Sequence, residues 1–419
     1  MAAEKSGISL LPPDFHWKPV DFGDGPPKDA PPPPLAVLEN FRNKKFAGTG
    51  FNTIFRPNNV FSTATSPSLV NPPPPQPSTA AVLELNLTTE TLYFSDQLGN
   101  VPNRGFQNQG DINLNGISYL QHVKDVTNTG TGKADGEPTD IHAETGFWMN
   151  VPASNVNPVV GNTLLRMASI PHGTTINAQG GPAVPQGEPN APSIGKRDIT
   201  PFQLQGGQRI PKHIESQIAT NSDTPRLPKD LTLFMKEGTI TQAILSDPAT
   251  VLNNVNAQLT ITNTLTFNVT TSNSTPFSPP PVPFVTEGGG TANSAFLVGA
   301  TSDTPNANAI EMDATFWVET VTSTITIPVS TPNTKLPLPL QPAFKPLDGS
   351  PPPPLPTFLV TPPQTVTQPI VMNVKYTQIQ YAQIVYLQFA GLVWPHASVA
   401  TLVLAEPIVI DAAAFATAE

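Results

Sequence analysis

The segment MNVKYTQIQYAQIVYLQF, residues Met372–Phe389, decides the fold of this chain. Apolar and polar side chains alternate along it, and a period of two is the pattern of a β-strand, whose successive side chains point to opposite faces. It is the longest strand signal in the sequence. One face is predicted to carry Tyr376, Gln378, Gln380, Ala382, Ile384, Tyr386 and Gln388, and the other mostly Val374, Thr377, Ile379, Tyr381, Gln383, Val385, Leu387 and Phe389.

Shorter segments of the same kind precede and follow this strand, with clusters of Gly, Asn and Pro between them. Such a pattern is typical of an antiparallel sandwich or barrel. Short helices are predicted at Leu35–Phe41 and after Ser246-Asp247-Pro248, where an N-cap residue precedes a proline. The predicted strands are Val82–Thr88, Thr91–Phe94, Gly116–Val123, Ile141–Val151, Leu164–Ile170, Gln258–Val269, Ala314–Ile327 and Ser398–Leu404.

The composition excludes several classes of protein. The chain has 52 prolines in 419 residues and only 12% charged residues, against usual shares of roughly 5% and roughly 25%. A net charge of -10 without a long basic cluster is unsuited to nucleic acid or to an anionic membrane. Cysteine is absent, which excludes disulfides and thiolate metal sites. Neither an apolar leader nor a run of about 18 apolar residues is visible, so we expect a cytoplasmic protein without membrane insertion.

Proline-rich segments lie between predicted strands and not only at one end, which favours one barrel or sandwich with long surface excursions over two linked domains. They include Pro31–Pro34, Pro72–Pro75, Pro279–Pro283 and Pro337–Pro369. The expected organisation is a proline-rich N-terminal segment with the first strand (1–80), the first half of a barrel (81–180), a loop-rich insertion (181–235), a helix with further strands (236–330), a proline-rich excursion (331–370) and the closing strands (371–411).

Two histidines stand at strand positions from which they could face one cavity. His396 lies in Trp394–Leu402, at the junction of two predicted strands, where Trp394 and Pro395 are expected to hold it in place. Neutral imidazole is the commonest axial ligand of haem iron, so His396 is the candidate metal ligand. The alternative is a histidine with an ordinary core or surface position.

His142 and Glu144 are expected on one face of their strand, roughly 7 Å apart. A buried carboxylate needs a partner, so a His–Glu or an Arg–Glu contact is predicted. A surface ion pair is the alternative.

A third group surrounds Arg166, Met167 and His172. Arg166 and Tyr119 could hold a carboxylate, as a carrier of acidic lipids would require. His172 follows a proline and precedes Gly173, which turn formation alone would explain. Zinc bound by His142, His172 and His396 is a further hypothesis. The chain has no dinucleotide fingerprint, phosphate loop or Gly-x-Ser-x-Gly elbow.

Three of these motifs together resemble the small haem-binding β-barrels of the nitrobindin type, which are calycin-like barrels related in fold to lipocalins and fatty-acid-binding proteins. They are the glycine-containing strand Gly48–Phe51, the segment His142–Trp148 and the segment Pro395–Leu402. The resemblance implies a ten-stranded barrel in which His396 ligates the iron and His142 lies on the opposite haem face. NO, peroxide or peroxynitrite would then react at the open iron site. Residues 181–235 and 335–370 have no counterpart in such barrels.

We therefore expect a mostly β protein, an antiparallel calycin-like barrel with long proline-rich loops and one or two short helices, that binds haem or another apolar small molecule inside the barrel. The candidate ligand-binding residues are His142, Glu144, Tyr119, Arg166, Met167, His172 and Trp394. The alternatives are a haem-free carrier of a fatty or other hydrophobic acid, a structural protein that assembles with copies of itself, and a cofactor-free enzyme that uses His142, Glu144 and His172.

Overall fold

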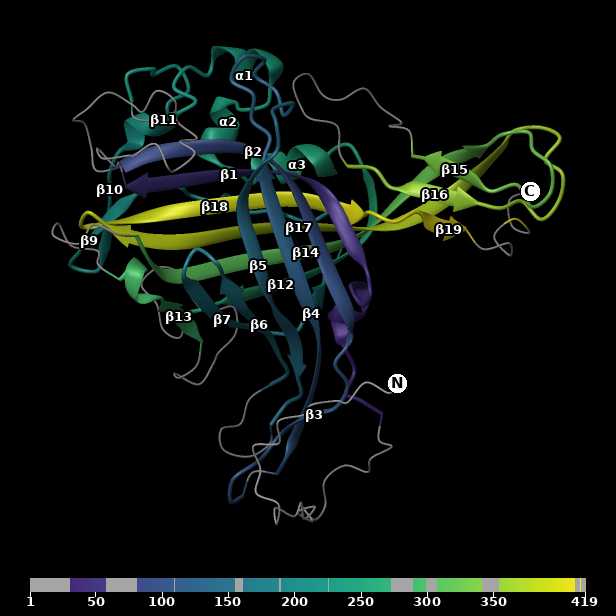
Figure 1. The fold of residues 1–419 in the computed structure, drawn as a ribbon, viewed down its shortest axis with the longest axis horizontal. Coiled ribbons are helices and arrows are strands. Elements are labelled where there is room, and N and C mark those ends of the chain that lie inside the picture. Colours follow the sequence, from purple (N-terminus) through teal and green to yellow (C-terminus); the bar gives the residue numbers. More distant parts are fainter. Residues whose placement is uncertain are drawn as a thin grey trace, which may run out of the picture.

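Ten antiparallel strands close into a barrel, as the alternating segments predict (Figure 1). The computed structural model describes residues 31–57, 81–108, 110–154, 161–187, 190–224, 226–272, 289–298, 307–340, 354–410 and 415. The first and last barrel strands, β1 and β18, pair with each other and so close the barrel. In order around the barrel the strands are β1 (Lys45–Pro57), β2 (Ala81–Gln97), β4 (Ile112–Asp125), β5 (Thr139–Val151), β6 (Thr163–Ile170), β7 (Thr174–Gly180), β12 (Thr260–Thr270), β14 (Asn308–Ile327), β17 (Ile370–Phe389) and β18 (Leu392–Leu404).

Glycines on β1 allow the barrel to close. A Cβ atom on Gly48 would lie 2.0 Å from the carbonyl oxygen of Thr401 on β18, and one on Gly50 would lie 2.3 Å from that of Val399. No side chain fits at such distances, so only glycine permits this approach. The predicted glycine-containing strand Gly48–Phe51 is thus present within β1.

The barrel wall is uneven in its pairing. β1 and β2 pair along the whole of β1, whereas β7 and β12 share the single pair Thr270 and Gln179 in the described ranges. Two short strands extend the sheet on either side of this seam, β8 (Val184–Pro185) beside β12 and β13 (Gly290–Asn293) beside β7. β3 (Val101–Asn103) pairs with β4, and the 3₁₀ helix η3 spans Ala295–Leu297.

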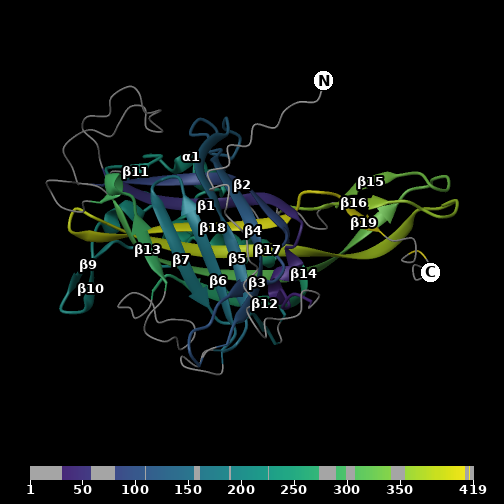
Figure 2. The same cartoon turned by 60° about the horizontal axis from the view of Figure 1, so that its bottom comes forward.

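β14 and β17 run beyond the barrel and carry a second, small sheet, which projects to one side in both views (Figures 1 and 2). This sheet consists of β15 (Leu336–Pro339), β16 (Thr357–Val360) and β19 (Ile408–Ile410). Phe358 and Val360 of β16 are fully buried against the β14–β17 extension. The predicted proline-rich excursion 331–370 therefore contains ordered strands. The proline runs Pro72–Pro75 and Pro279–Pro283 lie outside the described residues.

A layer of short elements covers the outer face of β1, β2 and β18, and α1, α2 and α3 lie above these strands in Figure 1. It explains why Leu83, Leu85 and Leu87 of β2 point outward and are still buried. The predicted helix after Pro248 is present as α3. The elements are β9 (Phe202–Gln205), β10 (Gln208–Pro211), η2 (Ile214–Gln217), β11 (Arg226–Leu227), α1 (Thr232–Glu237), α2 (Gln242–Ser246) and α3 (Thr250–Asn256).

A buried polar cluster joins α3 to the outer face of the barrel. The carboxylate of Glu319 on β14 accepts hydrogen bonds from Asn256 Nδ2 at 3.0 Å and from Gln378 Nε2 on β17. Gln380 Nε2 donates to Thr401 Oγ1 at 2.9 Å. Glu319 and Gln378 have no exposed surface, so this cluster is isolated from water.

The interior of one half of the barrel is filled by side chains. The 3₁₀ helix η1 (Ala36–Asn40) packs Val37 and Leu38 into this half. Aromatic rings fill the rest, among them Phe267 and Phe316, whose ring centroids are 5.2 Å apart in a stacked arrangement. The remaining void is about 10 Å³, about the space of one water molecule. Among the helices of the described ranges, none has the length and apolar content that crossing a bilayer requires.

Candidate functional site

The other half of the barrel contains a cavity of about 280 Å³. Its walls are mainly apolar side chains, which come from most of the barrel strands, including β1, β14 and β17. Ligand pockets of proteins are typically mostly apolar, with a few convergent polar groups and volumes of about 300–1,000 Å³. The apolar walls include Ile170, Ile176, Met312, Val385 and Leu387.

Three histidines from separate elements line this one cavity: His142 from β5, His172 from the turn between β6 and β7, and His396 from β18. The prediction that His142 and His396 face one cavity is confirmed. The imidazole rings of His142 and His172 stack with their centroids 5.4 Å apart.

A β-bulge determines how β5 presents His142. Val123 pairs with His142 and Lys124 pairs with Asp140, which leaves Ile141 unpaired. Both Ile141 and His142 consequently face the cavity, whereas strict alternation would turn Ile141 outward.

The surroundings keep His396 neutral. Burial, together with the neighbouring His142 and His172, lowers the pKa of His396 to about 3. Burial, with the neighbouring His142 as a further cause, also lowers the pKa of His172. A neutral imidazole has one nitrogen with a free lone pair, which can accept a hydrogen bond or ligate a metal ion.

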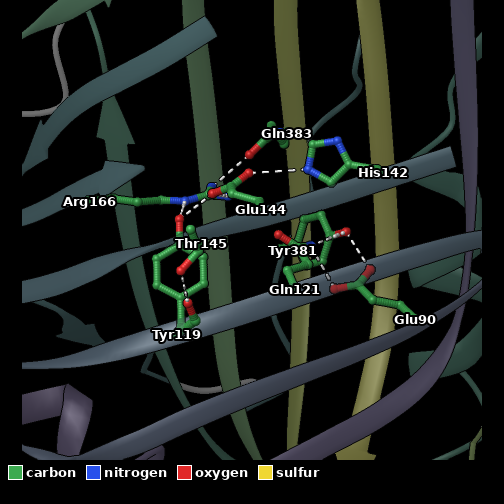
Figure 3. A network of polar contacts seen from close by, with 9 residues as sticks. All are labelled: Glu90, Tyr119, Gln121, His142, Glu144, Thr145, Arg166, Tyr381 and Gln383. Carbon is green, nitrogen blue, oxygen red and sulfur yellow. Dashed lines mark hydrogen bonds and ion pairs between the residues drawn. The ribbon is translucent and has the colours of Figure 1, made fainter. Parts of the chain in front are cut away.

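Four polar residues of the cavity lining, His142, Gln121, Tyr381 and Gln383, form what we call the cavity floor. Figure 3 shows the network of polar contacts that these four residues make with buried residues outside the lining. Glu144 accepts hydrogen bonds from Arg166 Nη2 at 2.7 Å and from the Tyr119 hydroxyl, and its Oε2 lies 3.3 Å from His142 Nε2. Both contacts predicted for this carboxylate, to histidine and to arginine, are therefore present. Burial opposes ionisation of Glu144, but the Arg166 guanidinium and the hydrogen bond with His142 outweigh it and lower the pKa to about 2.

Arg166 has its donors engaged within the protein. Its Nε donates to the Tyr119 hydroxyl at 3.0 Å and its Nη1 to Gln383 Oε1 at 2.6 Å, in addition to the bond with Glu144. The guanidinium is thus neutralised by an internal carboxylate and is not presented free to the cavity.

A second carboxyl group, Glu90 on β2, lies beside the same floor and was not among the residues singled out from the sequence. The Tyr381 hydroxyl donates to Glu90 Oε2 at 2.6 Å and Gln121 Nε2 donates to Oε1 at 2.7 Å. Burial raises the pKa of Glu90 to about 7 despite these hydrogen bonds. Tyr381 and Gln121 both line the cavity, so they connect Glu90 to it.

Five of the predicted ligand-binding residues do not line the cavity, and these are Tyr119, Glu144, Arg166, Met167 and Trp394. Met167 is on the face of β6 opposite Arg166, as strand alternation requires. Trp394 is buried, where its ring stacks on Phe389 at 4.7 Å and its Nε1 donates to the Phe389 carbonyl at 2.9 Å. Trp394 therefore supports the start of β18 and does not contact a molecule in the cavity.

The histidines do not assemble into a metal cluster. Within the described ranges, no group of three or more His, Asp or Glu side chains is placed to hold a metal ion, so the zinc hypothesis has no support. For haem, the neutral His396 imidazole fits the role of axial ligand. The residues that line the cavity include no Lys or Arg, so none of them would pair with the propionates of a porphyrin.

Comparison with family models, with curated proteins and with solved structures found no match to this chain. The barrel is thus shown by the structure itself, and the likeness to nitrobindin-type proteins rests on the three short motifs.

Proposed function

We propose that the protein binds a compact apolar molecule, bearing at least one polar atom, in the histidine-lined cavity of the barrel. The observation that supports this most directly is the division of the interior, with one half filled by aromatic rings and the other left as an apolar cavity of about 280 Å³. A barrel that served only as a scaffold would gain stability from a filled core, because empty apolar volume destabilises proteins by about 24 cal/mol per Å³.

The ligand that fits best is uncharged. The lining has no Lys or Arg, so an acidic ligand, such as a fatty acid, would have to displace Glu144 from Arg166 to pair with a guanidinium. Breaking a buried pair of this kind costs about 3–5 kcal/mol. An uncharged ligand with a carbonyl or hydroxyl group can instead use the cavity's neutral donors and acceptors, such as His142 and Gln121.

Haem is the second candidate, favoured by one observation, the neutral imidazole of His396 on the cavity wall. A bound haem would supply an iron centre for the chemistry of small oxidants or NO. His396 would hold that iron, and His142 and His172 would line the same pocket. The volume of the cavity and its lack of cationic side chains favour a smaller, uncharged ligand.

Two variants on β7 test occupancy of the cavity. Ile176 lines the cavity and Thr175, its neighbour, is exposed on the opposite face. The protein is purified, extracted with organic solvent, and the extract is identified by mass spectrometry. We expect a stoichiometric apolar compound in the wild type and in Thr175→Trp, and none in Ile176→Trp, whose indole would fill the cavity.

Hemin titration followed by absorption spectroscopy distinguishes the second candidate. The control is His122→Ala, because His122 is exposed on the outer face of β4. A Soret band that is lost in His396→Ala but kept in this control would establish haem binding. An empty extract, combined with no binding of small apolar compounds in saturation-transfer NMR, would refute the proposed function.

A further inference from the structure

Two carboxyl groups in contrasting environments lie under the same cavity. Glu144 is held as an anion by Arg166 and His142, and Glu90 is buried among uncharged hydrogen-bond partners. Pairs of acidic groups whose environments drive their pKa values apart mark the base side and the acid side of proton-transfer sites. The pKa of Glu144 is about 2 and that of Glu90 about 7.

His142 provides the base side. Its Nε2 lies 3.3 Å from Glu144 Oε2, and an ionised carboxylate only accepts hydrogen bonds, so Nε2 carries the proton. The other ring nitrogen, Nδ1, then has a free lone pair. It points away from Glu144 in Figure 3 and has no partner among the hydrogen bonds of the described residues. The side chain is 23% exposed, and it lines the cavity.

Tyr381 provides the acid side. One hydrogen occupies the 2.6 Å contact between its hydroxyl and Glu90 Oε2. When Glu90 is protonated, the carboxyl can supply that hydrogen, and the phenol hydrogen is then free to point into the cavity that Tyr381 lines. A phenol that receives a hydrogen bond from a carboxylic acid is a strong donor toward an oxygen that gains negative charge.

We propose that this cavity floor enolises a small apolar ketone, with Nδ1 of His142 as the base and the Tyr381 hydroxyl, backed by Glu90, as the donor to the carbonyl oxygen. The proposal rests on the proposed function, because the ketone would be the compact apolar ligand. A ketone matches the site because it combines apolar surface with a single acceptor oxygen.

The proton balance of the step is complete within the site. The C–H bond next to the carbonyl breaks and its proton goes to Nδ1 of His142. The electron pair of that bond forms the C=C bond, and the carbonyl π pair moves to oxygen, which takes the Tyr381 hydrogen while Glu90 passes its own to Tyr381. The reverse steps return the protons to the same carbon, or to a conjugated one if the ketone is unsaturated. No oxidant, reductant or second substrate is consumed.

Glu144 and Arg166 are positioning residues in this scheme. Glu144 fixes the tautomer and orientation of His142 and stabilises the imidazolium that forms, and Arg166 keeps Glu144 ionised. His172 stacks on the ring of His142 and limits its rotation.

Exchange of ketone α-protons in heavy water, followed by proton NMR, tests the proposal. The probes are cyclohexanone, acetophenone and trans-decalone, and saturation-transfer NMR measures their binding to each variant separately. We expect exchange above the buffer rate with the wild type and with His122→Gln. His142→Gln, whose amide can still bond to Glu144, should lose about 100-fold or more of the enzymatic rate. Tyr381→Phe should also lose about 100-fold or more, because it removes the donor to the developing oxyanion.

The outcomes separate the two proposals. Binding of a ketone without accelerated exchange, or exchange that survives in His142→Gln, overturns the enolisation proposal and leaves the binding function intact. Absence of binding by all three ketones and by every other apolar compound overturns both. Circular dichroism and thermal unfolding of each variant show that a lost rate is not a lost fold.

Discussion

Replacing Glu319 with glutamine should change the pH dependence of stability in a defined direction. Glu319 is completely buried between α3 and the barrel wall, where Asn256 and Gln378 donate to its carboxyl group. Burial raises its pKa from 4.5 to about 7, although both hydrogen bonds act against this rise. Gln378 Oε1 has no hydrogen-bond partner in this cluster, so rotation of that amide would provide an acceptor for a protonated Glu319 or for a glutamine at this position.

The direction of the effect follows from proton counting. Between pH 4.5 and about 7, folded Glu319 binds a proton that the unfolded chain has lost. The free energy of unfolding therefore decreases as the pH rises through this window. The difference between an unfolded-state pKa of 4.5 and a folded-state pKa of about 7 corresponds to about 3 kcal/mol of stability. All of this stability is present below pH 4.5, and none of it remains above the folded-state pKa.

Equilibrium urea unfolding at about pH 4 and about pH 8 measures this contribution. Glu90 and Glu311, whose pKa values burial also raises, will lower the wild-type stability over the same range. We therefore compare the wild type with Glu319→Gln, which should lose about 3 kcal/mol less free energy of unfolding between these two pH values. Glu137→Gln, at an exposed position, is the control. Equal losses in Glu319→Gln and wild type would refute the assignment of a neutral buried carboxyl to Glu319.

Three further predictions concern stability, measured by urea unfolding. Gly50→Ala places a Cβ atom 2.3 Å from a carbonyl oxygen of β18 and should lower the free energy of unfolding by about 1–3 kcal/mol. The control Gly110→Ala, with no atom near the new Cβ, should lower it far less, and equal losses would contradict the barrel closure. Glu144→Gln leaves Arg166 buried without its carboxylate and should lower the free energy of unfolding by about 3–5 kcal/mol. Adding Arg166→Met should restore part of this loss, and strictly additive losses in the double variant would argue against the ion pair. Trp394→Phe removes the indole hydrogen bond and should cost about 1–3 kcal/mol while leaving cavity ligands bound, and loss of ligand would show that Trp394 reaches the cavity.

The class of fold could be predicted because most barrel strands alternate over many residues. β7 was missed because its sequence, TTINAQG, has one large apolar side chain. Its inward positions are Ile176, Ala178 and Gly180, and small residues there leave no visible alternation. The seam with β12 requires such small residues, since a Cβ on Gly180 would lie 1.7 Å from the carbonyl oxygen of Asn268.

The layer over β1 and β2 could not be predicted from periodicity, because its elements are too short to show one. α1 and α2 span only Thr232–Glu237 and Gln242–Ser246. The β9–β10 hairpin did have a signal, the Gly206-Gly207 pair, and both glycines have positive φ. Residues 181–235 thus contain more regular structure than a loop-rich insertion implies.

Glu90 was not predicted as a site residue because the leucines of β2 face outward and its polar residues face the barrel interior. Alternation normally puts leucines inside a barrel and polar residues outside. On β2, Leu83, Leu85 and Leu87 face the covering layer, and the polar face with Thr88 and Glu90 is turned to the interior. Only knowledge that the layer exists would have indicated which face is inside.

The three histidines were recognised from local sequence, but their convergence could not be. His142 and His172 are close because β5 and β6 are adjacent strands and His172 lies in the turn directly after β6. His396 joins them because β1 and β18 close the barrel. That closure depends on long-range register, which no short motif contains.

The seam between β7 and β12 has a consequence for ligand exchange. With η1 and its aromatic neighbours filling one end, a molecule cannot pass through the barrel and must leave near where it entered. Transient separation of β7 from β12 disrupts a single register pair in the described ranges, and β7 carries Thr174 and Ile176 of the cavity wall. Local opening there needs less free energy than opening of any fully paired strand. The dissociation rate of the ligand should therefore follow the opening rate of this seam, and amide hydrogen exchange of β7 would report both.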